Sequence, residues 1–203
     1  MRTCDFDFDL PDELIAQYPT ERRSASRLLW LDGSSGMLND SSFDQLPSFL
    51  SPGDLLVFND TRVIKARLAG RKKSGGKVEI LIERILDERQ ALAHIRASHA
   101  PKLGERIIIA GSVEVETLQR RSDLYLLNFP GERTVSELLD IHGALPLPPY
   151  ITHTPGSLDE KRYQTIYARE SGAIAAPTAG LHFDEPMLYA LRENGDETAF
   201  ITL

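Results

Sequence analysis

The middle of the chain constrains the fold most, because short strand patterns follow one another there with no helix between them. Residues 77–86 alternate between apolar and polar side chains, and Val78, Ile80 and Ile82 are expected to face inward. Similar short apolar segments follow at residues 91–95, 106–109, 113–118 and 123–129. Strands at this spacing are typical of a small barrel or sandwich. We therefore predict a β-barrel module over residues 63–148.

The segments on either side of this module carry other signals. Residues 55–58 are a continuous apolar run, typical of a strand buried on both faces. Residues 27–31 and 198–203 are also interpreted as buried strands. The sequence therefore predicts an α/β (α+β) domain interrupted by an inserted small β-barrel domain. The α/β domain would be discontinuous, formed by residues 1–62 and 149–203.

Three helices are predicted in the second half of the chain. Capping boxes begin at Thr134 and Ser157, and Asp184 caps a helix that ends at Gly195. The second helix would carry Tyr163 and Tyr167 four residues apart on one face. Such a pair suits stacking on a base or flanking a cation, although burial in the core is the commoner explanation.

Composition excludes several classes of protein. The 203 residues carry a formal net charge of -7 and contain one cysteine, so no disulfide can form within the chain. No apolar run approaches the ~20 residues of a membrane helix. The first residues, M-R-T-C-D-F-D, contain no apolar core of a secretory signal. We expect a soluble cytoplasmic protein with no membrane contact.

A basic run departs from this acidic background. Residues 62–77 hold seven cations and no acid, namely Arg62, Lys65, Arg67, Arg71, Lys72, Lys73 and Lys77. A patch of this kind attracts phosphates even on an acidic protein. A solvated strand edge, whose lysines block aggregation, explains the same pattern.

Polar side chains come directly after the strand predicted at residues 55–58. Asp60 can act as a base or hold an amine, Asn59 and Thr61 can orient groups, and Arg62 can hold a carboxylate or a phosphate. Ligands of open α/β sheets lie past the carboxyl ends of strands. An Asx turn, in which Asp60 only caps the backbone, is the competing explanation.

A second segment, residues 175–183, combines small residues with a histidine. Gly180 permits close backbone approach to a ligand, Thr178 can donate a hydrogen bond, and His182 is the best general acid or base in the chain. A structural histidine in a loop before a helix is the alternative. We predict no metal site, because Cys4 and the histidines form no ligand cluster.

Taken together and in order, these segments closely resemble one family, the S-adenosylmethionine:tRNA ribosyltransferase-isomerases of the queuosine pathway. The resemblance rests on the motifs PGDLLVFNDTRVI at 52–64, GGKVE at 75–79, PLPPYI at 146–151, YQTIY at 163–167 and AAPTAGLHF at 175–183. It covers essentially the whole chain. The family fold, an α/β domain interrupted by a β barrel, agrees with the domain prediction.

The resemblance implies a transferase reaction. The ribosyl part of S-adenosylmethionine would be transferred and isomerised onto 7-aminomethyl-7-deazaguanine at the wobble position of tRNA. Epoxyqueuosine would form, and adenine and methionine would leave. S-adenosylmethionine would thus be a consumed co-substrate, with no metal. The tRNA anticodon loop would be the partner. The family is monomeric, although an exposed sheet edge would allow this chain to self-associate.

On the matched positions we assign His182 to proton transfer, and Asp60 to the amine or a ribose hydroxyl. Arg62 would hold the methionine carboxylate or a phosphate. The expected substrate-binding residues are Asn59, Thr61, Arg62, Tyr163, Pro177, Thr178, Ala179, Gly180 and Phe183. The expected tRNA-binding residues are Lys65, Arg67, Arg71, Lys72, Lys73 and Lys77.

Two departures from the family pattern leave alternatives open. His99 stands where the family usually has lysine. Family members also continue beyond the strand that ends at Leu203, so we expect a C-terminal part of the α/β domain to be missing. A non-catalytic tRNA-binding fragment is therefore the alternative to an active enzyme. A β-barrel interaction module without RNA binding is a third.

Overall fold

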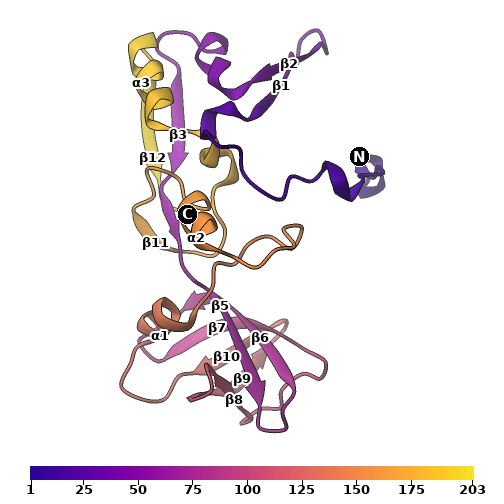
Figure 1. Cartoon of the computed structure of the whole chain (residues 1–203), viewed down its shortest axis with the longest axis vertical. Coiled ribbons are helices and arrows are strands. Elements are labelled where there is room, and N and C mark those ends of the chain that lie inside the picture. Colours follow the sequence, from indigo (N-terminus) through magenta and orange to yellow (C-terminus); the bar gives the residue numbers. More distant parts are fainter.

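The computed structural model describes residues 1–203, which form two lobes along one long axis (Figure 1). We call residues 67–142 the barrel lobe and the remaining residues the mixed lobe. The first residues of the chain extend away from the rest of the mixed lobe (Figure 1). The chain enters the barrel at Arg67 and leaves it at Ala144, and these two residues exchange backbone hydrogen bonds of 3.1 and 2.8 Å.

The barrel lobe is a closed sheet of six antiparallel strands in the order β10-β7-β6-β5-β8-β9. The strands are β5 (Arg67–Lys72), β6 (Lys77–Ile85), β7 (Gln90–Ala97), β8 (Arg106–Ile109), β9 (Val113–Arg121) and β10 (Leu124–Asn128). Val78, Ile80 and Ile82 are buried inside, as predicted. Helix α1 (Val135–His142) belongs to the same core through Val135, Leu138 and Leu139. The predicted mixture of a β barrel with helices and parallel strands is thus confirmed.

The mixed lobe contains three two-stranded sheets. Strands β1 (Arg27–Leu31) and β2 (Leu38–Ser42) form an antiparallel hairpin, whereas β3 (Leu55–Asn59) pairs in parallel with β12 (Glu197–Ile201) and β4 (Thr61–Val63) with β11 (Glu170–Ala173). The helices are α2 (Ser157–Arg162) and α3 (Glu185–Asn194), and the 3₁₀ helices are Thr3–Phe6, Asp12–Leu14, Arg23–Ala25, Phe43–Phe49 and Thr178–His182. Strand β4 therefore lies in this lobe, not in the barrel.

Two of the three predicted helices begin as their sequence signals indicate. Thr134 and Glu137 form a reciprocal capping box at the start of α1, with hydrogen bonds of 2.7 and 3.2 Å. Asp184 accepts a hydrogen bond from the Met187 amide at 3.1 Å, and Gly195 ends α3 with a φ of 87°. Helix α3 packs Met187 and Leu191 against the mixed lobe.

The second helix differs from its prediction. Its N-cap is Gly156, whose amide donates to Asp159 at 2.8 Å, and the helix ends at Arg162. The side chain of Arg23 binds the carbonyls of Lys161, Arg162 and Gln164, three acceptors that a longer helix would use internally. Tyr163 and Tyr167 therefore do not share a helix face. They belong to separate apolar clusters.

The three strands predicted to be buried are partly exposed, which corrects that expectation. Leu29 on β1 is 61% exposed, Leu55 on β3 is 57% exposed and Ile201 on β12 is 45% exposed. Each strand belongs to a sheet of only two strands, so few of its side chains are covered on both faces. Among the helices of the chain, none has the length and apolarity needed to cross a membrane.

The crossing between the lobes leaves no space for a side chain at Gly143. An added Cβ would overlap the carbonyl oxygens of Lys65 and Leu139. We expect Gly143→Ala to lower the free energy of unfolding by about 1–3 kcal/mol, as overpacking does. Urea unfolding followed by circular dichroism measures this change. Gly76→Ala, which meets only open space and Lys72 Cδ at 3.9 Å, should stay within about 0.5 kcal/mol of the parent. Equal losses in both variants would contradict the close crossing.

Candidate functional site

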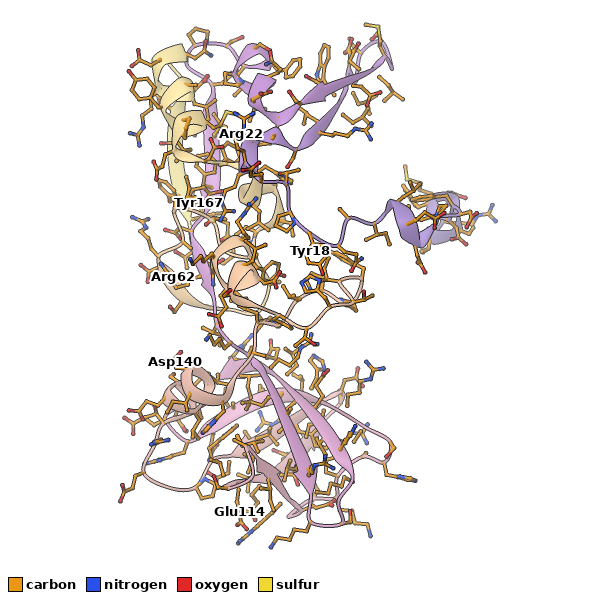
Figure 2. The ribbon with its side chains drawn as sticks, viewed as in Figure 1. Tyr18, Arg22, Arg62, Glu114, Asp140 and Tyr167 are labelled. Atoms are coloured by element: carbon orange, nitrogen blue, oxygen red, sulfur yellow. The ribbon has the colours of Figure 1, made fainter.

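A cavity of about 530 Å³ lies in the mixed lobe, between the N-terminal segment and the region from Leu147 to Tyr163. Residues 16–20, Arg23 and Ser26 line one side, and the 3₁₀ helix Thr178–His182 lines another. Tyr18 lies where the N-terminal segment passes α2 (Figure 2). The walls therefore come from segments that are far apart in the sequence.

Two arginines fix these walls to each other. The Arg23 guanidinium donates to the carbonyls of Lys161, Arg162, Gln164 and Leu181 at 2.9–3.3 Å. Arg162 Nη1 returns hydrogen bonds to the carbonyls of Thr20 at 2.8 Å and Glu21 at 3.1 Å. Burial, and then the charge of Arg162, lowers the pKa of Arg23, yet a guanidinium stays protonated in proteins. The two side chains thus hold the N-terminal segment against α2.

His182 stands in the wall of this cavity, at the end of its 3₁₀ helix. Its Nδ1 lies 2.8 Å from Ser26 Oγ, and the Phe43 ring lies 5.3 Å from the imidazole, centroid to centroid. Nε2 has no hydrogen-bond partner in the protein and is not sealed from solvent. Burial, and then the charge of Arg23, lowers the pKa of His182 below its ordinary value. The imidazole is therefore neutral near pH 7.

Aromatic rings form another part of the wall. The ring of Tyr18 stacks on His153, with centroids 4.7 Å apart and an interplanar angle of 14°. His153 Nε2 lies 3.1–3.2 Å from the two carboxylate oxygens of Asp159. Tyr150 and Tyr163 also line the cavity. Flat apolar faces beside cations suit a planar heteroaromatic ligand.

Asp60 lies outside this cavity, at the junction of β3 and β4. It is 2% exposed, and its Oδ2 accepts hydrogen bonds from Arg169 Nη2 at 2.5 Å and Nε at 3.1 Å. Its Oδ1 accepts from the Thr202 hydroxyl at 2.8 Å. These hydrogen bonds, that of Arg169 first, hold the pKa of Asp60 below its ordinary value. Both carboxylate oxygens are thus occupied by protein groups.

The neighbours of Asp60 have local partners as well. Asn59 Oδ1 accepts from the amide of Thr61 at 2.9 Å and from its hydroxyl at 2.8 Å, which is an Asx turn. Arg62 Nη2 donates to the Ala168 carbonyl at 2.7 Å, between β4 and the loop before β11 (Figure 2). The turn is thus formed by Asn59, whereas Asp60 forms an ion pair.

The residues predicted to bind substrate divide between two hollows. Tyr163, Thr178 and His182 line the cavity described above. A second hollow of about 360 Å³ is lined by five more of them, namely Asn59, Pro177, Ala179, Gly180 and Phe183. Thr61 and Arg62 line neither. An added Cβ at Gly180 would overlap the Tyr167 hydroxyl and Thr165, so this glycine serves close packing.

Sequence reasoning missed Arg23, Ser26 and Arg162. Each of them forms a hydrogen bond with an atom more than 130 residues away, and no local spacing signals these contacts. The short run Glu21-Arg22-Arg23-Ser24 shows no motif that separates Arg23 from an ordinary surface arginine.

The basic run is partly neutralised. Lys65, Arg67, Lys72 and Lys73 lie 2.8, 3.6, 3.7 and 3.8 Å from the carboxylates of Glu160, Glu79, Glu105 and Glu114. A shallow groove of about 860 Å³ on the barrel is lined by Arg71, Lys72, Lys73, Lys77 and Arg96. Glu114 marks this part of the barrel in Figure 2. Arg71, Lys77 and Arg96 have no carboxylate partner, so the groove keeps a positive charge.

The chain is similar to known proteins over nearly its whole length. A sequence model of the family described as queuosine biosynthesis protein matches residues 3–203. The S-adenosylmethionine:tRNA ribosyltransferase-isomerase of Nitrosospira multiformis is 58% identical over 203 residues, which are 100% of this chain and 57% of that relative. The crystal structure of S-adenosylmethionine tRNA ribosyltransferase from Thermotoga maritima has 28% identity and a TM-score of 0.40, and the match covers 98% of this chain and 57% of that one. The chain therefore spans 57% of the length of the curated relative.

The Asp60–Arg169 pair predicts a change in acid stability. A carboxylate whose folded-state pKa is depressed stabilises the fold above its unfolded pKa of about 3.9, and this contribution disappears as the pH falls through the folded-state pKa. Arg169→Met removes the main cause of the depression. We therefore expect its midpoint of acid unfolding, measured by circular dichroism, to move to higher pH.

Arg192→Met is the matched control, because Arg192 on α3 forms no ion pair. Its acid midpoint should remain that of the parent. An unchanged midpoint in Arg169→Met would show that the ion pair does not hold Asp60 ionised.

Proposed function

The chain belongs to the family of queuosine biosynthesis proteins, and we propose that it supplies the acid–base site of an S-adenosylmethionine:tRNA ribosyltransferase-isomerase. In this reaction the ribosyl part of S-adenosylmethionine is transferred and isomerised onto 7-aminomethyl-7-deazaguanine at the tRNA wobble position. Epoxyqueuosine forms, and adenine and methionine leave. The observation that carries the proposal is the cavity in which His182 stands beside aromatic and cationic side chains.

The proposed chemistry requires a base beside the sulfonium of S-adenosylmethionine. In this proposal a proton leaves the carbon next to the sulfonium, and the electron pair of the broken C–H bond stays on that carbon. A neutral imidazole with a free nitrogen is suited to accept the proton near pH 7. His182 has this character, because its pKa is lowered and its Nε2 has no partner.

The size and walls of the cavity fit a ligand of this kind. Its volume of about 530 Å³ falls within the roughly 300–1,000 Å³ of small-molecule pockets. Tyr18, Tyr150 and Tyr163 offer flat faces to adenine or to the deazaguanine. Thr178 also lines the cavity. S-adenosylmethionine is the co-substrate in this proposal.

Asp60 and Arg62 lie outside the cavity, and their contact with substrate remains a prediction. For Asp60 to hold the amine, the hydrogen bonds from Arg169 and Thr202 would have to open. In the arrangement described, Asp60 instead anchors the strand junction next to the second hollow, in which Asn59 and Gly180 lie.

The barrel groove is the proposed contact for the tRNA backbone. Its three unpaired cations, Arg71, Lys77 and Arg96, provide charge for phosphates. The wobble base would then be splayed out of a single-stranded loop, as proteins that bind single-stranded RNA require. Lys65 does not line this groove, and its ion pair with Glu160 leaves it less free charge.

A second candidate function is tRNA binding without catalysis. It is favoured by one observation, the barrel groove, in which Arg71, Lys77 and Arg96 have no carboxylate partner. A barrel that binds no RNA is the remaining candidate.

Adenine release separates these functions. We expect the chain to release adenine from S-adenosylmethionine only when tRNA carrying 7-aminomethyl-7-deazaguanine is present. His182→Gln should lower the rate about 100- to 10,000-fold, the usual contribution of a general base. His94→Gln, an exposed histidine on β7, is the control and should retain the parent rate.

The other possible results of this assay decide between the candidate functions. Tight tRNA binding with no adenine release would overturn the catalytic proposal in favour of the second candidate. Neither binding nor release would overturn both. Full activity in His182→Gln would remove the histidine from the mechanism.

The groove is tested by the salt dependence of tRNA affinity. The triple variant Arg71→Gln, Lys77→Gln and Arg96→Gln should bind tRNA more weakly. Its slope of log affinity against log salt should be reduced by up to about 2.1, since each phosphate contact on a single strand contributes about 0.7. Filter binding at several salt concentrations measures the slope. Arg84→Gln, on β6 but outside the groove, should change neither quantity. An unaltered slope in the triple variant would contradict RNA contact at the groove.

A further inference from the structure

The hydrogen bonds around Ser26 have a defined direction. Ser26 Oγ lies 3.1 Å from the Arg23 carbonyl oxygen and 2.8 Å from His182 Nδ1. A carbonyl oxygen can only accept, and a hydroxyl has one proton. Ser26 therefore donates its proton to Arg23, and the contact with His182 is donated by Nδ1–H.

This direction selects one tautomer of the neutral imidazole. With the proton on Nδ1, the lone pair lies on Nε2. Nε2 has no partner in the protein and is not sealed from solvent, and His182 lines the cavity. From this geometry we infer that Ser26 is a positioning residue that keeps His182 in the Nδ1–H tautomer, with Nε2 as the proton acceptor. The inference rests on the proposed function.

Both Ser26 and His182 are held in place by the same short segment. The backbone carbonyl of Ser26 accepts from the Phe43 amide at 2.8 Å. Arg23, three residues before Ser26, donates to the carbonyl of Leu181 at 2.9 Å, directly before His182. Residues 23–26 therefore fix both the backbone next to His182, through Arg23, and the orientation of its ring, through Ser26.

No carboxylate is hydrogen-bonded to the imidazole. The groups around it are the Ser26 hydroxyl, the Phe43 ring and the Arg23 guanidinium, while Asp184 binds the Ser24 and Met187 amides instead. A carboxylate in this position would stabilise the imidazolium and raise its pKa. A hydroxyl selects the tautomer without adding negative charge, so the base stays neutral.

The bonds and charges of the proposed proton transfer to His182 balance. The C–H bond beside the sulfonium breaks, its proton forms an N–H bond at Nε2, and the electron pair stays on carbon next to the positive sulfur. The resulting imidazolium has a proton on each nitrogen, and its Nδ1–H remains bonded to Ser26. No other reactant is required.

The tautomer can be measured without any activity assay. In the whole chain labelled with 15N-histidine, long-range 1H–15N spectra above the pKa of His182 should show a protonated Nδ1 and an unprotonated Nε2. Ser26→Ala should shift the population toward the Nε2–H form, and Ser26→Thr should restore the parent pattern. Ser24→Ala is the matched control, because this hydroxyl makes no contact with His182. A predominantly Nε2–H imidazole in the parent chain would overturn the inference.

The turnover rate tests the positioning role of Ser26 independently of the spectra. Ser26→Ala should lower kcat about 10- to 100-fold with little change in KM, as expected for loss of a group that orients a catalytic side chain. Ser26→Thr should recover most of kcat. If His182→Gln is fully active, the proposed function fails whatever the spectra show. If His182→Gln is inactive but Ser26→Ala retains the parent kcat and tautomer, the positioning role alone is overturned.

Discussion

The guanidinium of Arg23 links several distant segments of the mixed lobe around the cavity. Arg23 satisfies four backbone carbonyls from three stretches of chain, at the end of α2, just after it and before His182. Partly buried carbonyls need such partners, because unpaired backbone groups are costly inside a protein. Arg162 in turn donates hydrogen bonds to backbone carbonyls of the N-terminal segment. The end of α2, the walls of the cavity and the placement of His182 all depend on this reciprocal pair of arginines.

The same pair also shapes the electrostatics of the site. Arg23 brings a fixed positive charge close to His182, which together with burial favours the neutral imidazole. Its hydrogen bonds to carbonyls consume most of its donors, so it serves the protein rather than a ligand. The cavity thereby combines a neutral base, flat aromatic faces and a positive surrounding field.

Local patterns predicted the parts of the structure that local interactions determine. The barrel strands follow from alternation that includes Val78, Ile80 and Ile82, and α1 and α3 follow from caps whose partners lie three residues away. The cavity could not be predicted in this way, because the partners of Arg23 and Ser26 are brought near only by the folded chain. The sequence singles out the segment around Asp60 only because polar residues follow an apolar run directly. Its ion pair with Arg169, 109 residues away, had no sequence signal.

The crossing at Arg67 and Ala144 affects how the chain reaches its fold. Since these two residues are hydrogen-bonded to each other, the entry and exit of the barrel lie side by side. Once the barrel has formed, its about 78 residues connect the two parts of the mixed lobe as a tight turn would. The entropy cost of closing this long loop has then already been offset by the contacts inside the barrel. The distant halves of the mixed lobe then become near neighbours along the effective chain. If the barrel forms first, strands such as β4 and β11 can pair across a short effective chain separation and not across a long one.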